Sequence, residues 1–402
     1  MIHIGIDARL YGTASGTGIG RYVEELIRAL AALDREHRFT VFLRRDTYDT
    51  FVPPNARWSK VLADFRPYSL AAQTRFPGVI RRAQVDCMHF THFDHPITYR
   101  APFLVTIHDL ILLHHPSIRT STLGPIRFWT KFAAYRHVLA HATHRSWRIM
   151  TPSHTVKREV AARFGVLPEK IVPTLLGIDH GTPTHSDEPS ATHDLPLAPF
   201  ILYIGNAYPH KNVEQLIRVL PEVRKRVPDM RLVLVGRTDD FSKRLQRTAH
   251  HSQLPPDAIV FFGQATEAER TQLLRSASAY VSASLDEGFD MPTVEALAVD
   301  TPVIASDIPI HHEVLGTHAT FVAKNDDRTL INALCTTATS AAQRDTLEGV
   351  QHAQQYTWRA CALQTLAVYR EIGALSAHRN GNETHDNETT RASQTRGAGR
   401  GA

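Results

Sequence analysis

Cysteines and long apolar runs are scarce in this sequence of 402 residues, and acidic residues are locally absent. The three cysteines, Cys87, Cys335 and Cys361, lie far apart and match no disulfide or zinc spacing, so we expect a reducing, cytoplasmic compartment. No run of about 18 apolar residues occurs, so no transmembrane helix is expected. The first residues lack the basic start and apolar core of a signal peptide, and we expect none.

Acidic residues are missing between Leu110 and Arg158, a stretch that carries eight arginines and lysines within a chain of net charge +5. A helix within 119–148 would have an apolar face opposite a basic one; the apolar face is Phe128, Phe132, Tyr135 and Leu139, and the basic face is Arg127, Lys131 and Arg145. One interpretation is a helix that lies on an anionic membrane surface. The other is a surface helix whose apolar stripe packs in the domain core. The cations follow no nucleic-acid-binding motif, so nucleic acid is not expected as a partner.

The chain is long enough for two domains of about 150 to 200 residues, and its 43% apolar content is ordinary for a globular protein. An apolar strand, a glycine-containing loop and an amphipathic helix open the sequence, and the same pattern recurs from Phe200. This recurrence predicts two similar doubly wound α/β domains in tandem. We expect a first domain at 1–180, a linker at 181–199, a second domain at 200–355, a final amphipathic helix at 356–375 and a disordered tail at 376–402.

The first loop contains G-T-G-I-G, with glycines at Gly16, Gly18 and Gly20. This spacing differs from the dinucleotide fingerprint G-x-G-x-x-G, so an NAD site is not expected. The glycines would allow close approach of the backbone to a donor or acceptor. The alternative is a plain flexible loop, because glycine commonly marks turns.

The most informative stretch is Leu285 to Ala296, which reads L-D-E-G-F-D-M-P-T-V-E-A. An apolar strand precedes it and a helix follows, with Pro292 suited to the first turn. A helix that begins after such a loop offers free N–H groups and the positive end of its dipole to an anion. With Glu295 facing hydroxyl groups beside that anion, the pattern indicates a nucleotide sugar. The alternative is an ordinary strand–loop–helix junction in which Glu295 merely favours the dipole.

The segment E-G-F-D-M-P-T-V-E-A resembles the E-G-F-G-x-P-x-x-E-A signature of the retaining glycosyltransferases of family four. The likeness extends over about residues 1–372, through T-I-H-D-L at His108-Asp109 and Y-I-G-N-A-Y-P-H-K-N, which contains Lys211. It implies the GT-B fold, in which two Rossmann-like domains face each other across a cleft and the final helix packs back on the first domain. Asp290 replaces the family's second glycine; we expect its carboxylate to point at a sugar hydroxyl or outward, because it would repel a diphosphate.

The resemblance also implies the roles of individual residues. The implied catalytic residues are Glu287 at the donor sugar, His108 facing the reacting sugar, and Lys211 at the diphosphate. The implied donor-binding residues are Lys211, Arg237, Gly263, Gln264, Gly288, Phe289, Asp290, Met291, Thr293 and Glu295, the last holding the ribose. Gly16, Gly18, Gly20 and Asp109 would form the acceptor and phosphate loop. An arginine that often accompanies the family's lysine is absent, and Asn206 and His210 occupy its neighbourhood.

The resemblance therefore implies a retaining, metal-independent hexosyltransferase. The first expectation is transfer of mannose from GDP-mannose to a glycan or lipid-linked acceptor in bacterial O-antigen or exopolysaccharide synthesis. The alternatives are a GT-B sugar-nucleotide epimerase and a non-catalytic nucleotide-sugar-binding partner. No cofactor is expected beyond the nucleotide-sugar donor, and the protein could lie on the cytoplasmic face of the inner membrane.

A metal site is not expected. His89, His92 and His95 are three apart and could ligate zinc, but with 24 histidines in the chain chance spacing explains them better. Asp239-Asp240 and Asp326-Asp327 are interpreted as surface loops.

Overall fold

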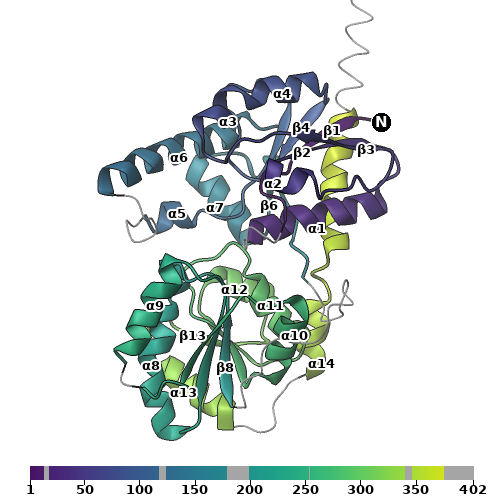
Figure 1. Ribbon diagram of the computed structural model, residues 1–402. Coiled ribbons are helices and arrows are strands. Elements are labelled where there is room, and N and C mark those ends of the chain that lie inside the picture. The colour runs from purple at the N-terminus through teal and green to yellow at the C-terminus, as the bar shows by residue number, and fades with distance from the viewer. Residues whose placement is uncertain (13–17, 117–123, 179–198, 253, 340–345, 375–402) are drawn as a thin grey trace, which may run out of the picture.

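The computed structural model describes residues 1–12, 18–116, 124–178, 199–252, 254–339 and 346–374. Two α/β domains lie one above the other in Figure 1, the first in purple to blue and the second in green. Each is built on one sheet whose neighbouring strands all run parallel. Gly16, the expected tail at 376–402 and nearly all of the expected linker at 181–199 lie outside the described residues.

The sheet of the first domain has seven strands in the order β3-β2-β1-β4-β5-β6-β7. Their bounds are β1 His3–Asp7, β2 Arg38–Leu43, β3 Trp58–Leu62, β4 Cys87–Phe90, β5 Phe103–Thr106, β6 Arg148–Thr151 and β7 Ile171–Pro173. The strand order reverses between β1 and β4. Open α/β sheets place their ligands at the carboxyl ends of the strands around such a switch point.

The sheet of the second domain has six strands in the order β10-β9-β8-β11-β12-β13. Their bounds are β8 Phe200–Ile204, β9 Arg231–Val235, β10 Ile259–Gly263, β11 Ala279–Ser282, β12 Val303–Ser306 and β13 Thr320–Val322. The switch point lies between β8 and β11, so this sheet repeats the order of the first. β8 is buried at every position, as expected for a parallel strand covered on both faces.

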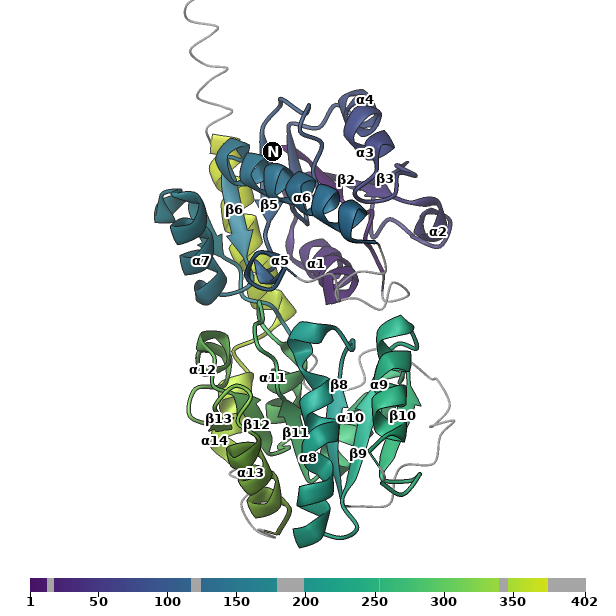
Figure 2. The same cartoon turned by 90° about the vertical axis from the view of Figure 1, so that its left-hand side faces the viewer.

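Helices cover both faces of the first sheet (Figures 1 and 2). One face is covered by α1 Gly18–Leu33 and by a helix at 358–374, and the other by α4 Phe76–Arg82, α6 Pro125–Arg145 and α7 His154–Phe164. Shorter elements connect these layers: α2 Arg45–Tyr48, α3 Leu70–Thr74, α5 Ile111–His114 and the 3₁₀ turn η3 Pro168–Lys170.

The second sheet is covered in the same way. One face carries α8 Val213–Arg226, α9 Asp240–His250 and α13 Asp327–Thr339. The other carries α10 Glu267–Ser276, α11 Met291–Ala298, α12 Pro309–Leu315 and α14 Thr346–Ala353. A 3₁₀ turn, η4 Pro209–Lys211, precedes α8.

The final helix, 358–374, is drawn in yellow and lies along the first domain in both views (Figures 1 and 2). Its Tyr369 hydroxyl lies 2.7 Å from Nδ1 of His89, and Gln364 accepts a hydrogen bond of 2.9 Å from the amide of Leu175. Where the chain crosses between the domains, the amide of Ile178 donates to the carbonyl of Tyr356 at 3.2 Å. The first domain is thus completed by the last part of the described chain.

Helix α7 begins at the boundary between the domains. Ser153 caps it, its hydroxyl accepting a hydrogen bond of 3.1 Å from the amide of Val156. The first amides of the helix, those of His154 and Thr155, donate at 2.6 and 2.7 Å to the carboxylate of Glu313, which belongs to α12 of the second domain. A carboxylate at the positive end of a helix dipole is favourably placed, so this contact helps to hold the two domains together.

The apolar stripe of α6 faces the first domain. Phe128 and Leu139 are buried, and the ring of Tyr135 lies 5.0 Å from that of Phe93. Leu139 and Tyr135 thus pack in the core of the first domain, as the second interpretation expects, while contact of α6 with a membrane surface stays a prediction. Ile126 and Trp129, also on α6, are 85% and 49% exposed. Among the described helices, none has the length and apolarity needed to cross a bilayer.

Candidate active site

The candidate active site is a cavity of about 840 Å³ between the domains, at the carboxyl ends of strands from both sheets. Loops that follow β5, β8, β9, β10 and β11 contribute to its wall. The residues expected from the sequence that line it are Gly18, His108, Asp109, Lys211, Arg237, Gln264, Glu287, Gly288, Phe289, Asp290 and Met291. Four other expected residues lie outside this lining: Gly20, Gly263, Thr293 and Glu295.

The switch point of the second sheet brings Lys211 and Glu287 together. Lys211 follows β8 and Glu287 follows β11, the strands between which the order reverses. The Lys211 ammonium donates a short hydrogen bond to Oε1 of Glu287, and the hydroxyl of Ser284 donates to the same oxygen at 2.7 Å. Lys211 and Glu287 are far apart in the sequence. They lie close in space because the strands that precede them, β8 and β11, are neighbours in the sheet.

Burial and charge act together on this pair. Burial would lower the pKa of Lys211, but the carboxylates of Glu287 and Asp290 outweigh it and hold that pKa above its usual value. Burial raises the pKa of Glu287 to about 7, with Lys211 opposing the shift. The lysine is therefore a permanent cation, while Glu287 is ionised above about pH 7.

The carboxylate of Asp290 is hydrogen-bonded inside the second domain. Its carboxylate accepts hydrogen bonds from the hydroxyl of Ser282 at 2.7 Å and from Nε2 of His311 at 3.0 Å, inside the second domain. Burial acts to raise its pKa, but the bond from His311 and the charge of Lys211 outweigh it and lower the pKa to about 2. The carboxylate therefore does not point outward, and a contact with a sugar hydroxyl stays a prediction.

The backbone at Asp290 explains why glycine is usual at this position of the signature. Its φ is 66°, in the left-handed region, which aspartate tolerates better than most residues. Asp290 is also the residue that precedes α11, and its carbonyl accepts hydrogen bonds from the amide and hydroxyl of Thr293. The aspartate thus keeps the glycine's conformation and adds a buried contact to His311.

Glu295 lies beneath the floor of the cavity, between two arginines. Arg21 donates from Nη1 to Oε1 at 2.6 Å, and Arg270 donates a short hydrogen bond to Oε2. Burial acts to raise the pKa of Glu295, but these two charges outweigh it and lower the pKa. Arg21 belongs to α1 of the first domain and Arg270 to α10 of the second, so Glu295 joins the domains through charge.

Sequence reasoning missed both arginines, and both line the cavity. Arg21 follows the glycine loop in the first turn of α1, and a cation at that place could have indicated a role. Arg270 had no comparable signal, because its helix begins with a capping box of Thr266 and Glu269 that is typical of any helix start. These arginines are candidates for the cation that accompanies Lys211.

His108 and Gly288 bring the two domains into contact at the cavity. The carbonyl of His108 would lie 2.0 Å from a Cβ added at Gly288, so a side chain has no room there. The carbonyl of Gly288 accepts a hydrogen bond of 2.9 Å from the hydroxyl of Ser153. Burial lowers the pKa of His108 to about 4. Its Nε2–H donates to the carbonyl of Thr91 at 2.9 Å, which leaves Nδ1 as an acceptor for a hydroxyl group.

Two helix N-termini meet at the same cavity. A Cβ at Gly18, the first residue of α1, would lie 3.3 Å from Cε of Met291, the first residue of α11. Both residues line the cavity. Because the N-terminus of a helix carries a partial positive charge, this part of the cavity favours an anion.

The histidines considered above as a zinc site form hydrogen bonds with different residues. His89 contacts Tyr369 and Thr106, while Nε2 of His95 lies 2.8 Å from Nδ1 of His141. The paired aspartates hold helices instead: Asp239 caps α9, and Asp327 binds Arg218 at 2.8 Å.

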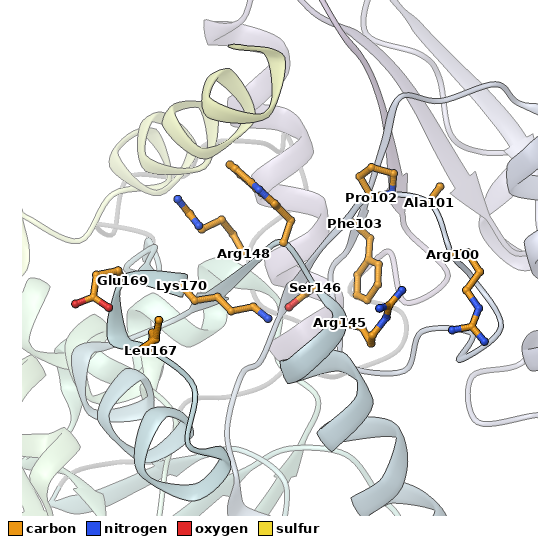
Figure 3. Close-up of a pocket in the computed structure, with 11 residues that line it drawn as sticks. Arg100, Ala101, Pro102, Phe103, Arg145, Ser146, Arg148, Leu167, Glu169 and Lys170 are labelled. Atoms are coloured by element: carbon orange, nitrogen blue, oxygen red, sulfur yellow. The ribbon is translucent and has the colours of Figure 1, made fainter. Parts of the chain in front are cut away.

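A second cavity, of about 580 Å³, opens at the amino ends of β5, β6 and β7, remote from the first (Figure 3). Two of its four basic side chains are engaged with neighbouring elements. Arg148 pairs with Glu371 of the final helix at 3.1 Å, and Lys170 donates to the carbonyls of Thr143 and His144 at the end of α6. These cations hold helices in place, so we assign the active site to the cavity between the domains.

Two family models match this chain. Residues 198–340 match the model described as glycosyl transferases group 1, and residues 16–181 match glycosyltransferase family 4. The chain is 29% identical over 234 residues to the O-antigen chain mannosyltransferase RfbU of Salmonella typhimurium, covering 57% of this chain and 62% of RfbU. It is 24% identical to the O-antigen chain mannosyltransferase B of Escherichia coli, covering 88% of this chain and 96% of that protein. The RfbU match thus spans less than two thirds of that relative.

Solved structures show the same architecture. A sucrose-phosphate synthase from Thermosynechococcus elongatus superposes with a TM-score of 0.72 at 19% identity, covering 93% of this chain and all of that one. WaaG, a glycosyltransferase involved in lipopolysaccharide biosynthesis, superposes with a TM-score of 0.61 at 13% identity, covering 90% and 95%. The predicted arrangement of two doubly wound domains across a cleft is confirmed.

Proposed function

Because the chain belongs to the glycosyltransferases of group 1 and family 4 and has the GT-B fold, we propose that it transfers mannose with retention of anomeric configuration. The proposed donor is GDP-mannose, and the proposed acceptor is a glycan or a lipid-linked glycan of bacterial O-antigen or exopolysaccharide synthesis. The mannosyltransferase names of RfbU and its Escherichia coli counterpart support this choice of sugar. The epimerase and the non-catalytic binding partner are not favoured by these relatives.

The observation that carries the proposal is the presence of four cations in the lining of the cavity. Lys211, Arg237, Arg21 and Arg270 line it together with the N-termini of α1 and α11. A nucleoside diphosphate presents concentrated negative charge, and fixed cations and amides stabilise it most when it departs as the leaving group. Arg21 and Arg270 would take the place of the arginine that the sequence lacks beside Lys211.

The proposed reaction breaks the bond between the anomeric carbon and the diphosphate oxygen and forms a bond to an acceptor oxygen on the same face. The acceptor's proton passes to an oxygen of the departing phosphate. Ionised Glu287 lies at the mannose and stabilises the positive character that its ring acquires. His108 accepts a hydrogen bond from a sugar hydroxyl at Nδ1, and Glu295 is proposed to bind the ribose after exchanging one arginine contact.

The proposed reaction requires no metal ion, because the cations of the chain itself neutralise the diphosphate. A donor panel of GDP-mannose and UDP-linked hexoses, with release of nucleoside diphosphate measured in the presence of EDTA, tests the donor and the metal independence. Of the donors in the panel, only GDP-mannose is expected to be turned over. Turnover restricted to UDP donors would refute the mannose assignment, and loss of turnover that Mg²⁺ restores would refute metal independence. Nuclear magnetic resonance of the product's anomeric proton tests retention.

We further propose that α6 attaches the protein to an anionic membrane surface on the cytoplasmic side, bringing it to a lipid-linked acceptor. The support is the exposure of Ile126 and Trp129 beside the exposed cations Arg127, Lys131 and Arg136. Co-sedimentation with phosphatidylglycerol vesicles should fall in Trp129→Ala and at high salt. Binding to neutral vesicles of equal strength, or none at low salt, would refute the attachment.

A further inference from the structure

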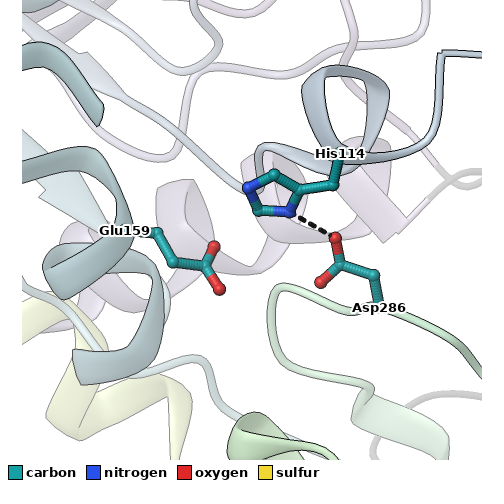
Figure 4. A group of neighbouring side chains, drawn as sticks. All are labelled: His114, Glu159 and Asp286. Atoms are coloured by element: carbon teal, nitrogen blue, oxygen red, sulfur yellow. Dashed lines mark hydrogen bonds and ion pairs between the residues drawn. The ribbon is translucent and has the colours of Figure 1, made fainter. Parts of the chain in front are cut away.

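Three side chains with metal-ligating atoms meet where the two domains face each other, beside the cavity (Figure 4). His114 comes from α5 and Glu159 from α7 of the first domain, while Asp286 precedes Glu287 in the second domain. Nδ1 of His114 lies 2.6 Å from Oδ2 of Asp286. The three potential ligand atoms all lie within 4.8 Å of one another.

One carboxylate of this group, that of Glu159, has no hydrogen-bond donor among the described residues. Glu159 is half-buried and makes no hydrogen bond with any residue in the described part of the chain, yet its carboxylate faces Asp286 and His114 (Figure 4). Burial, reinforced by the charges of Asp286 and Asp109, raises the pKa of Glu159 to about 7. His114 donates to Asp286, but no described residue donates to Glu159, so the two facing carboxylates favour a cation.

A fourth ligand lies within reach. Nε2 of His115 is 3.8 Å from Oδ2 of Asp286, and its side chain is 38% exposed, so it can turn toward the same centre. A zinc ion bound by nitrogen and oxygen lies about 2.0 to 2.2 Å from each ligand atom. Ligand atoms in tetrahedral geometry then lie about 3.4 Å apart, so the side chains must shift by about 1 Å from their observed positions.

We propose that His114, Glu159 and Asp286, with His115 in reach, bind a divalent transition-metal ion such as Zn²⁺ that fastens the two domains together. Imidazole nitrogen combined with carboxylate oxygen suits such ions better than Mg²⁺ or Ca²⁺, which prefer oxygen ligands alone. The ion displaces the proton that Nδ1 of His114 donates to Asp286, so binding releases protons.

The consequence is a restraint on domain movement and not a part of the transfer reaction. Asp286 is the residue before Glu287, so fixing it to α5 and α7 fixes the glutamate relative to the first domain. Donor entry and product release require the domains to separate, and such steps set the turnover of many enzymes. Bound Zn²⁺ should therefore lower kcat.

The test is calorimetric titration of the chelator-treated full chain with Zn²⁺. We expect one site in the wild type, and binding at least about tenfold weaker in His114→Ala and in Glu159→Gln. The matched controls are His144→Ala and Glu169→Gln, two exposed residues outside the cluster, which should keep the wild-type affinity. Thermal unfolding without metal establishes that each variant is folded. Equal affinity in the wild type and both cluster variants, or no binding by the wild type, would overturn the proposal.

A second measurement tests the coupling between domains. Zn²⁺ should raise the melting temperature of the wild type and lower its kcat, and it should do neither in His114→Ala, whose basal activity is unchanged. Equal inhibition of both proteins would overturn the restraint. Because calorimetry needs no donor sugar, the outcome of the binding test is independent of whether mannose transfer is correct.

Discussion

Gly288→Ala tests how closely catalysis depends on the contact between the domains. The added Cβ would lie 2.0 Å from the carbonyl oxygen of His108 and 3.3 Å from Cβ of Asp109. Gly288 is absent from the residues with positive φ, so the conflict is one of space and not of backbone conformation. The obstacle is backbone on both sides, which cannot rotate away as a flexible side chain could.

The size of the effect follows from this distance. Ordinary contact between non-bonded heavy atoms begins near about 3.5 Å, so the two backbones must separate by more than about 1 Å. Overpacking of this kind costs about 1 to 3 kcal/mol of stability if the domains stay together. A misplacement of about 1 Å between reacting groups can lower the rate about 100-fold, and Glu287 and His108 lie on opposite sides of this contact.

Kinetics and calorimetry together measure this prediction. We expect Gly288→Ala to lower kcat about 100-fold while affinity for GDP changes little, because most of the cations lie in the second domain. Gly78→Ala is the matched control, since its nearest neighbour would be 4.0 Å away at the flexible end of Arg82. A kcat close to that of the wild type would show that the contact between His108 and Gly288 is not required in the reactive state, and would refute the reasoning.

Three further predictions concern the charged residues. Lys211→Ala should lower kcat about 10- to 1,000-fold, since it removes a cation from the leaving diphosphate and leaves Glu287 buried without its partner; unchanged turnover would exclude Lys211 from the site. Glu295→Gln should lower the free energy of unfolding by about 3 kcal/mol, because two buried arginines lose their counter-charge, and it should weaken GDP binding by about 1 to 3 kcal/mol, because the ribose loses a charged acceptor; equal stability by denaturant titration would refute the pairing. The rate should fall below about pH 7 as Glu287 takes up a proton, whereas His108, with its pKa lowered to about 4, should add no change between about pH 5 and 9; a rate that holds down to pH 5 would refute this assignment.

The same pKa has a consequence for stability. A carboxyl group whose pKa is raised from 4.5 to about 7 binds its proton more tightly in the folded state than in the unfolded one. The contribution of Glu287 to the free energy of unfolding therefore falls as the pH rises from about 4.5 to 7. A stability profile measured on Glu287→Gln should lack this component.

The two-domain architecture could be predicted from the sequence because the same local pattern opens each domain. The strand–loop–helix pattern occurs twice, and parallel strands covered on both faces are nearly continuous apolar runs, as in β8 and β9. The apolar run at 303–305 is the last clear strand signal in the sequence, and β13, Thr320–Val322, gives no comparable signal. That strand is short, lies at the edge of its sheet and carries an exposed Thr320, so its apolar signal is weak.

The site was only partly readable for a different reason. A motif places residues that are close in sequence, such as Glu287 and Gly288, but the partners of Glu295 come from α1 and α10. The direction of the Asp290 carboxylate likewise depended on His311, which is 21 residues away and has no motif. Charge pairing between distant elements is set by the packing of the domains, which local patterns do not encode.

The return of the last helix to the first domain also constrains how the chain is made. His89 and Tyr369 are hydrogen-bonded although 280 residues separate them, and Phe39 lies beside the same tyrosine. At about 5 to 20 residues per second, a ribosome needs roughly 14 to 56 seconds to deliver Tyr369 after His89. During that time one face of β1 and β2 lacks part of its cover, while the second domain has already emerged and can fold. Vectorial synthesis thus lets the second domain mature before the first, and a nascent chain stalled before residue 358 exposes an apolar surface to chaperones.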